Sequence, residues 1–476
     1  MLQARDGLAQ VVGQKLGCRE VLLGTVSTGA DKSMTRAIYW FRNDLRLHDQ
    51  RGLMAAAGEA SELALVYLHD ARHDAPAPWL PFVDRRMGSH RRRVLADTLL
   101  DLQSQLFRYR TEGRAQRLTL LSDGGIELLI DYASRLGVTR IHCEQIAAPE
   151  EQADVAALRA AGLDVQEHWQ SSLLEPDDLP FAIDQLPRVF TRFREWVEQA
   201  GIAPRNTTAS PQSLPPPPES MSLESLSRES GVETALGVSP QEVESRAAFP
   251  YSNVRCRGGE SAAVVYLQEY FESDKPQSYK LTRNGLVGLD YSTKFSPWLA
   301  SGAISPRRVF EALKAHEATQ GANESTYWIW FELLWRDYFR FLHLQHGRRL
   351  YLASGLSSFG APRHDRLAFG RWCAADSDER FIDAGMCELR LSGYLSNRMR
   401  QNVASYLVHD LQGDWRAGAA WFEHQLIDFD IYSNQGNWLY VSGRGTDPRV
   451  GRRFDPQRQA RQYDADGAYR RLWLDH

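Results

Sequence analysis

The chain has 476 residues, of which 43% are hydrophobic and 24% charged, and its formal net charge is −4. This length predicts two or three domains, and the composition is ordinary for a soluble globular protein. The charge excludes a uniformly basic chain, so any contact with nucleic acid must use a local basic patch.

No apolar run approaches the roughly 18 residues that a membrane-spanning helix needs, so we expect no membrane association. The five cysteines are scattered and form no C-x-x-C pair. This argues against a disulfide framework or a zinc site and is typical of a reducing compartment, so we expect a cytoplasmic protein. Residues 1–33 resemble neither a secretory signal nor a transit peptide and are interpreted as an N-terminal extension or an upstream mis-assigned start.

Short apolar runs alternate with helical patterns in the first part of the chain. The predicted strands are residues 37–41, 63–68, 118–121 and 138–143, and the clearest predicted helices are 90–107 and 126–136. Strands that alternate with helices predict a parallel sheet covered on both faces. We therefore expect an α/β, Rossmann-like domain over residues 34–172.

The pattern is interrupted in residues 205–247, where four consecutive prolines occupy positions 215–218 and Ser, Thr and Glu dominate. Such a composition cannot bury a core and predicts an extended segment, either free or wrapped along a domain surface. We therefore expect an interdomain linker over residues 173–258.

Helical periodicity replaces the strand pattern from residue 259 onward. The predicted helices are residues 261–271, 306–317, 325–345, 382–391, 397–411 and 416–426. Residues 259–476 are therefore expected to form an all-α domain. Six arginines near its end could form a basic patch or a solvated tail: Arg444, Arg449, Arg452, Arg453, Arg458 and Arg461.

One face of the predicted helix 325–345 combines a carboxylate with aromatic rings. The spacing of three and four residues brings together Trp328, Glu332, Trp335, Arg336 and Phe339. Desolvation there would raise the pKa of Glu332 and let it hold or share a proton. The alternative is ordinary core packing with an ion pair between Glu332 and Arg336.

Two further stretches of the helical domain carry polar groups. Asn397 could cap the predicted helix 397–411 or read the edge of a base or a flavin. Asp428 and Asp430 have no neighbouring His or third carboxylate at metal spacing, so no metal site is predicted. Arg400 could neutralise Asp428 through a bidentate pair.

The stretch 279–305 carries closely spaced hydroxyl groups and a lysine. Ser292, Thr293, Lys294 and Ser296 could bind phosphates, although the frame of a P-loop is absent. The alternative is a helix start capped by serine.

Five ordered blocks of the chain together resemble one family. They are AIYWFRNDLRLHD (37–49), LDYSTKFSPWLASG (289–302), ELLWRDYF (332–339), SNRMRQNVASYLVHDL (396–411) and DFDIYSNQGNWLY (428–440). These blocks resemble the photolyase/cryptochrome flavoproteins, within them the cryptochrome-DASH branch, and the resemblance spans almost the whole chain from residue 37. It implies an N-terminal α/β antenna domain, a long linker and a C-terminal helical FAD-binding domain.

The resemblance implies roles for matched residues. The implied FAD contacts are Tyr279, Arg283, Ser292, Thr293, Lys294, Phe295, Ser296, Arg400, Asp428, Asp430 and Asn434. The carbonyl of Asn434 would face flavin N5, and Glu332 would bond the dimerised pyrimidines, with Asn397 beside it. The implied DNA contacts are Trp335, Arg336, Asn397, Arg398, Gln401 and Tyr440.

The implied activity is that of a deoxyribodipyrimidine photolyase, in which an electron from excited reduced FAD splits a cyclobutane pyrimidine dimer. Tyr440 and Gln401 stand where photolyases of duplex DNA carry a second lesion-stacking Trp and a Met. Tyrosine offers less aromatic surface than tryptophan and therefore stabilises a flipped lesion less. We expect repair of dimers in single-stranded or looped DNA, where no duplex has to be opened. RNA is a further candidate partner, and we expect a monomer.

The resemblance matches only part of the family's residues for electron supply and for light harvesting. Trp438 and Trp415 match the inner and middle tryptophans of the family's relay, or they are ordinary core residues. Pro362 falls, without gaps, where the outer tryptophan would be. Glu150 and Glu151 lie near the acidic residues with which relatives bind a folate, so we expect 5,10-methenyltetrahydrofolate as the antenna.

Two other functions remain open from the sequence. The chain could be a blue-light photoreceptor that signals through a partner without repair, or a nucleic-acid-binding protein that retains FAD as a relic. The presence of Glu332, Asn397 and Asn434 favours repair.

Overall fold

The structure, a computed structural model, describes residues 35–219, 229–239, 244–447 and 451–475. Met34–His476 forms one compact unit. The expected N-terminal extension over residues 1–33 and Arg449 of the arginine-rich tail lie outside the described residues.

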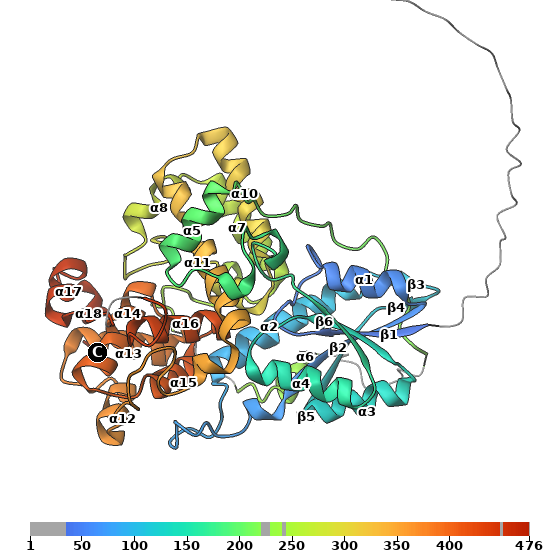
Figure 1. Cartoon of the computed structure of the whole chain (residues 1–476), viewed down its shortest axis with the longest axis horizontal. Helices are drawn as coiled ribbons and strands as arrows, with labels where there is room; N and C mark the ends of the chain where they lie inside the picture. The colour runs from blue at the N-terminus through green and yellow to red at the C-terminus, as the bar shows by residue number, and fades with distance from the viewer. Residues whose placement is uncertain (1–34, 220–228, 240–243, 448–450, 476) are drawn as a thin grey trace, which may run out of the picture. The chain divides into compact units, whose positions relative to one another are not determined.

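A five-stranded parallel sheet forms the centre of the N-terminal domain (Figure 1). Its order is β5 (Leu118–Gly124), β2 (Glu62–Asp70), β1 (Arg36–Phe41), β6 (Arg140–Glu144) and β7 (Asp164–His168). The four predicted strands are confirmed, and β7 is an additional edge strand. The short antiparallel pair β3 (Arg110–Thr111) and β4 (Arg114–Ala115) lies apart from this sheet.

The period of two along β1 divides its side chains between two cores. Tyr39 and Phe41 pack on the face covered by α1 (Arg51–Glu59), α2 (Ser89–Leu106) and α6 (Glu229–Ala235). Ile38 and Trp40 pack on the opposite face, which α3 (Ile126–Leu136) and α4 (Pro149–Ala160) cover. Burial on both faces explains why the strand reads as a continuous apolar run.

The C-terminal domain is helical throughout its described part. Its helices are α7 (Glu260–Glu272), α8 (Lys275–Thr282), α9 (Ser296–Ser301), α10 (Pro306–Gln320), α11 (Glu324–His346), α12 (Arg366–Ala374), α13 (Arg380–Ser392), α14 (Asn397–Ser405), α15 (Trp415–Gln425), α16 (Ile431–Val441), α17 (Pro456–Tyr463) and α18 (Ala468–Leu474). Each predicted helix is confirmed with small changes at its ends. The one change within a helix is at Tyr406–Asp410, where a π-helical turn replaces the α-helical continuation of α14.

The longest helix, α11, carries much of the site. It begins with a capping box, in which Asn323 accepts hydrogen bonds from the first-turn amides and Thr326 bonds back to the amide of Asn323. Its inward face, including Leu334 and Phe341, is fully buried. The polar and aromatic residues of the neighbouring face are thereby held on a rigid scaffold.

The span 173–258 is not a linker along its whole length, which corrects the expectation from its composition. It contains α5 (Phe190–Gln199), whose buried residues Phe190, Phe193 and Val197 pack with α11 in the core of the helical domain. The proline run wraps along the α/β domain, because the Leu63 amide donates to the Pro216 carbonyl at 3.0 Å.

Buried ion pairs join the two domains. Arg307 of α10 bonds Asp49 at 2.9 Å and Glu175 at 2.7 Å, and both its side chain and that of Asp49 are inaccessible to solvent. Such pairs tolerate little misalignment because an unpaired buried charge is costly. Within the described residues, none of the helices combines the length and hydropathy needed to cross a membrane.

Candidate functional site

A cavity of about 900 Å³ opens into the helical domain. Most of the residues that the sequence singles out line it: Tyr279, Arg283, Ser292, Thr293, Lys294, Phe295, Ser296, Glu332, Trp335, Arg336, Asn397, Arg400, Gln401, Asp428, Asp430, Asn434, Trp438 and Tyr440. Four of the five family blocks, together with Tyr279 and Arg283, therefore meet at one place. Arg398 and Trp415 are not among the lining residues.

Lys294 places a buried ammonium group at the wall of this cavity. Its side chain is only 2% exposed, and its Nζ has no hydrogen-bond partner among the described residues. It faces the rings of Tyr291 and Tyr394 at 3.3 Å and 4.8 Å from their centroids. Burial lowers the pKa of Lys294 well below its usual value. A buried amine without a hydrogen-bond partner fits an anionic ligand, whose charge would favour the protonated form of Lys294.

Arg400 and Asp428 form the expected pair on the cavity wall. One guanidinium nitrogen of Arg400 donates to both carboxylate oxygens of Asp428, at 2.8 and 2.9 Å. The Nε of Arg400 donates to the Leu395 carbonyl, which fixes the guanidinium plane. Asp428 is thus held as a carboxylate of defined orientation beside the ligand space.

Asp430 caps α16 and accepts a hydrogen bond from the Ser433 amide at 2.7 Å. Burial alone would raise the pKa of Asp430, but the charges of Arg336 and Arg340 hold it below its usual value. Arg336 lies 3.7 Å from Asp430 and donates to the carbonyls of Ser171 and Leu299.

These acceptors engage the guanidinium of Arg336, whose side chain is 11% accessible, and the expected contact of Arg336 with DNA stays a prediction. The alternative ion pair between Glu332 and Arg336 is absent. Arg336 instead fixes Asp430 and the end of the α/β domain against α11.

Asn434 presents one end of its amide to the cavity. Its Nδ2 donates to the Ala419 carbonyl at 3.1 Å, so the side-chain oxygen remains available as an acceptor. This orientation agrees with the expectation that the carbonyl of Asn434 accepts a hydrogen bond from a ligand.

Glu332 and Arg283 bond to each other at the mouth of the cavity. A third of the Glu332 side chain is accessible. Burial raises the pKa of Glu332, while the charge and hydrogen bond of Arg283 oppose this rise. Arg283 also covers the ring of Trp328, at 4.7 Å from its centroid. Arg283 therefore lies on the Glu332 side of the cavity.

The aromatic wall beside Glu332 is built from separate elements. Trp335 stacks on Phe190 of α5, with ring centroids 3.8 Å apart and planes 12° from parallel. Tyr440 meets Trp335 edge-on at 5.7 Å, and Arg452 covers Tyr440 at 4.4 Å. A flat ligand can stack only on the part of Trp335 that Phe190 leaves uncovered.

The polar residues at the start of α14 have different contacts: some line the cavity and others do not. Ser396, not Asn397, caps the helix by accepting from the Met399 amide. Asn397 and Gln401 line the cavity. Arg398 is not among the lining residues and donates to Asn284 at 2.8 Å, and its expected lesion contact stays a prediction.

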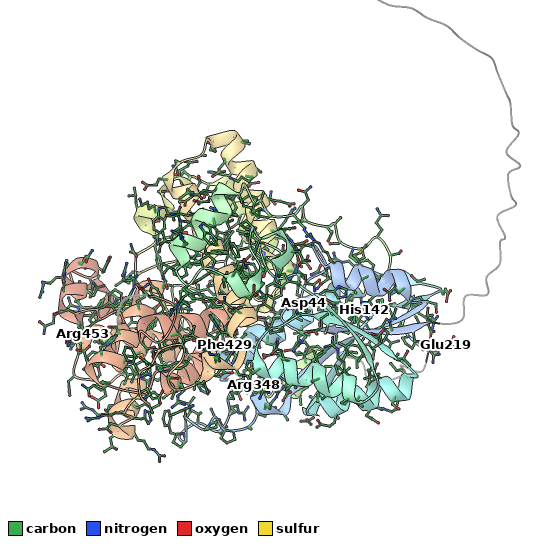
Figure 2. All side chains as sticks on the ribbon, in the orientation of Figure 1. Asp44, His142, Glu219, Arg348, Phe429 and Arg453 are labelled. Atoms are coloured by element: carbon green, nitrogen blue, oxygen red, sulfur yellow. The ribbon has the colours of Figure 1, made fainter. Side chains whose placement is uncertain are left out.

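A second cavity, of about 640 Å³, lies against the α/β domain. It is lined by Glu150 and Glu151, and by Trp415. Phe429 and Asn434 line both cavities, and Figure 2 shows Phe429 where the ribbons of the two domains meet. The two cavities are therefore neighbours that share a wall.

Several lining residues of the first cavity were not assigned to a site from the sequence, among them Phe190, Tyr291 and Tyr394. Phe190 was hidden by the composition of the supposed linker. Tyr291 directly precedes the Ser292–Lys294 run, so its place in the block was the signal that could have identified it.

Comparisons with known proteins agree with this site. The profile of the FAD-binding domain of DNA photolyase matches residues 328–476, and the DNA photolyase profile matches residues 37–218. A cryptochrome DASH of Xenopus laevis is 41% identical, covering 91% of this chain and 81% of the relative.

Two solved structures share the fold. A Synechocystis cryptochrome superimposes with a TM-score of 0.83 at 36% identity, covering 93% of this chain and 89% of its own. A class III photolyase from Agrobacterium tumefaciens gives a TM-score of 0.73 at 27% identity, covering 94% of this chain and 88% of its own. Together with the FAD-binding domain and its lined cavity, these likenesses mean that the chain belongs to the photolyase/cryptochrome family of flavoproteins, in its cryptochrome-DASH branch.

Proposed function

We propose that this protein uses blue light to split cyclobutane pyrimidine dimers, preferentially in single-stranded or looped DNA. The observation that carries the proposal is that Glu332 and Trp335 line the same cavity as Lys294, Arg400–Asp428 and Asn434. A lesion flipped against the first group would lie beside a cofactor held by the second. When bound, reduced FAD supplies the electron that opens the cyclobutane ring and takes it back afterwards.

The residues present fit FAD. The unpartnered ammonium of Lys294, with the hydroxyls of Ser292, Thr293 and Ser296 around it, suits a diphosphate. Asp428, fixed by Arg400, suits the polar edge of an isoalloxazine ring, and the free oxygen of Asn434 can accept a hydrogen bond from a ring N–H.

Glu332 is suited to hydrogen-bond a dimer carbonyl. Burial raises the pKa of Glu332 and Arg283 opposes this rise, so departure of Arg283 would favour the protonated carboxyl group, which can donate to an oxygen that gains negative charge. Arg283 holds Glu332 in the absence of DNA. Binding of a lesion would require this pair to open, which leaves Arg283 free to meet the negative charge of the DNA backbone.

The preference for single strands follows from the aromatic wall. Stacking on an aromatic side chain stabilises a base by about 1–3 kcal/mol, and extraction from a duplex costs a few kcal/mol. Tyr440 offers a smaller ring than tryptophan and already lies edge-on to Trp335 under Arg452. Stacking on this wall therefore offsets a smaller part of the free energy needed to open a duplex than stacking on two tryptophans would.

The second cavity is proposed to hold the antenna, 5,10-methenyltetrahydrofolate. Glu150 is engaged with Arg86 at 2.7 Å. Burial raises the pKa of Glu151 above its usual value, against the charge of Arg42, so its carboxyl group can share a proton with a pterin ring. The wall shared through Phe429 and Asn434 would place the antenna next to the flavin.

The substrate preference is tested with one thymine-dimer oligonucleotide offered as a single strand, in a loop and in a paired duplex under blue light. We expect the duplex to be repaired at least about tenfold more slowly, which corresponds to a deficit of ~1.4 kcal/mol. Tyr440→Trp should reduce the difference between the repair rates of the single strand and the duplex. Tyr109→Trp, in the α/β domain, should leave this difference unchanged. Equal repair of all three forms contradicts the preference, and no repair of any form favours the photoreceptor alternative.

Lys294→Met should have opposite effects on stability and on cofactor binding. The ligand-free variant should resist thermal unfolding better than the ligand-free parent, by roughly 1 kcal/mol or more, because a buried unpaired amine is removed. The variant should also bind FAD more weakly by about 1.5–3 kcal/mol, the contribution of a hydrogen bond to a charged group. Lys314→Met, at a half-exposed ion pair with Glu317, serves as the control. Unchanged FAD affinity would exclude Lys294 from the phosphate site.

Glu151→Ala should remove the antenna chromophore while FAD remains bound. Absorption spectra of the purified protein, after release of the chromophores, measure both contents. Glu195→Ala, on the exposed side of α5, should leave both unchanged. A purified protein whose second chromophore is not a folate, or a Glu151→Ala variant with full folate content, would refute the assignment.

A further inference from the structure

Trp438 and Trp415 are connected through α15. The ring of Trp438 lies directly over Gly418, where an added Cβ atom would come within 2.2 Å of the ring. Trp415 begins the same helix and donates from Nε1 to the Ala353 carbonyl at 3.2 Å. Both tryptophans are nearly inaccessible to solvent, at 2% and 1% exposure. An electron that leaves Trp415 can therefore be replaced only through another residue.

The segment around Pro362 carries no tryptophan, but it touches one from the other domain. His364, two residues after Pro362, packs edge-on against Trp79, with ring centroids 5.5 Å apart and planes at 81°. Trp79 belongs to the loop between β2 and α2. The indole of Trp79, from a distant part of the sequence, therefore packs beside the segment that contains Pro362.

This loop is anchored in the helical domain. Ala77 and Leu80 are buried in the same hydrophobic cluster as Trp415 and Trp438. The Gly88 amide donates to the His424 carbonyl at 3.0 Å. The position of Trp79 is thus fixed by the core that holds the relay.

Trp79 lies next to the start of α15. Arg416, the neighbour of Trp415, covers the ring of Trp79 at 4.8 Å from its centroid. Trp79 and Trp415 also line the same second cavity. Trp79 is only half-buried, so it is accessible to solvent while it also lies beside Arg416, the chain neighbour of Trp415.

Neighbouring tryptophans do not combine these properties. Trp421 and Trp372 belong to the same hydrophobic cluster, but they are 4% and 0% exposed. Neither can be reduced directly by a molecule in solution.

We propose that Trp79 is the outer electron donor of this protein, in the place where Pro362 leaves the relay without one. One electron passes from Trp79 to Trp415 and another from Trp415 to Trp438, which restores both buried indoles after photoreduction of the flavin. The Trp79 cation radical releases its Nε1 proton to water. A thiol in solution then returns a hydrogen atom, which regenerates tryptophan and leaves a thiyl radical.

The inference rests on the flavin photochemistry of the proposed function but not on dimer splitting. The test uses the FAD-loaded full chain with a thiol reductant and the variants Trp79→Phe, Trp415→Phe and Trp421→Phe. Transient absorption follows the tryptophan radical, and steady illumination follows flavin reduction.

We expect Trp79→Phe to lose the long-lived neutral tryptophan radical and to slow photoreduction several-fold, as Trp415→Phe does. Trp421→Phe should behave as the parent protein. A chemically reduced flavin needs no relay, so the yield of dimer splitting per photon absorbed by the flavin itself should be the same in Trp79→Phe as in the parent, whatever the content of the second cavity. A normal radical and normal photoreduction in Trp79→Phe would overturn the inference. Failure of the parent itself to split dimers would refute only the proposed repair.

Discussion

An ammonium group buried in a protein needs a nearby negative charge or loses its proton, and burial lowers the pKa of Lys294 well below its usual value, so the charge of an anionic ligand would favour its protonated form. The Nζ has no hydrogen-bond partner among the described residues, and two tyrosine rings are its closest neighbours. The charge of Glu388 favours the protonated amine, although burial raises the pKa of that carboxyl to about 7 and the hydroxyl of Tyr469 donates to it. The missing charge is the one that a cofactor diphosphate would bring.

The remaining parts of the site follow from where that cofactor would lie. Arg400 and Asp428 define one edge of the space, and Asn434 offers an acceptor on α16. The opposite wall carries Glu332 and Trp335 on α11, a helix held by its caps and its buried face. A cofactor and a flipped base would therefore lie in the same cavity. The one contact that must change is the pair between Arg283 and Glu332.

Local periodicity predicted the elements with strong patterns, but it missed others such as β7 and α5, and it could not show which segments pack against each other. Residues 37–41 and 325–345 were predicted because apolar positions recur at the period of a strand or a helix. The face shared by Glu332 and Trp335 followed from the same period. Contacts between distant segments leave no such pattern, since they depend on the tertiary fold. Composition therefore misassigned the segment containing Phe190, and spacing could not show that Arg336 turns towards Asp430. The contact between Trp79 and His364 also joins distant segments, so the sequence pattern could not predict it.

The account depends most on the carboxyl group of Glu332 facing the lesion. The direct measurement is the quantum yield of dimer splitting in Glu332→Gln with saturating single-stranded substrate and a fully reduced flavin. Glu324→Gln, at the exposed start of the same helix, is the matched control. The account predicts a lower yield only in Glu332→Gln, with FAD content unchanged. An unchanged yield in Glu332→Gln would contradict it.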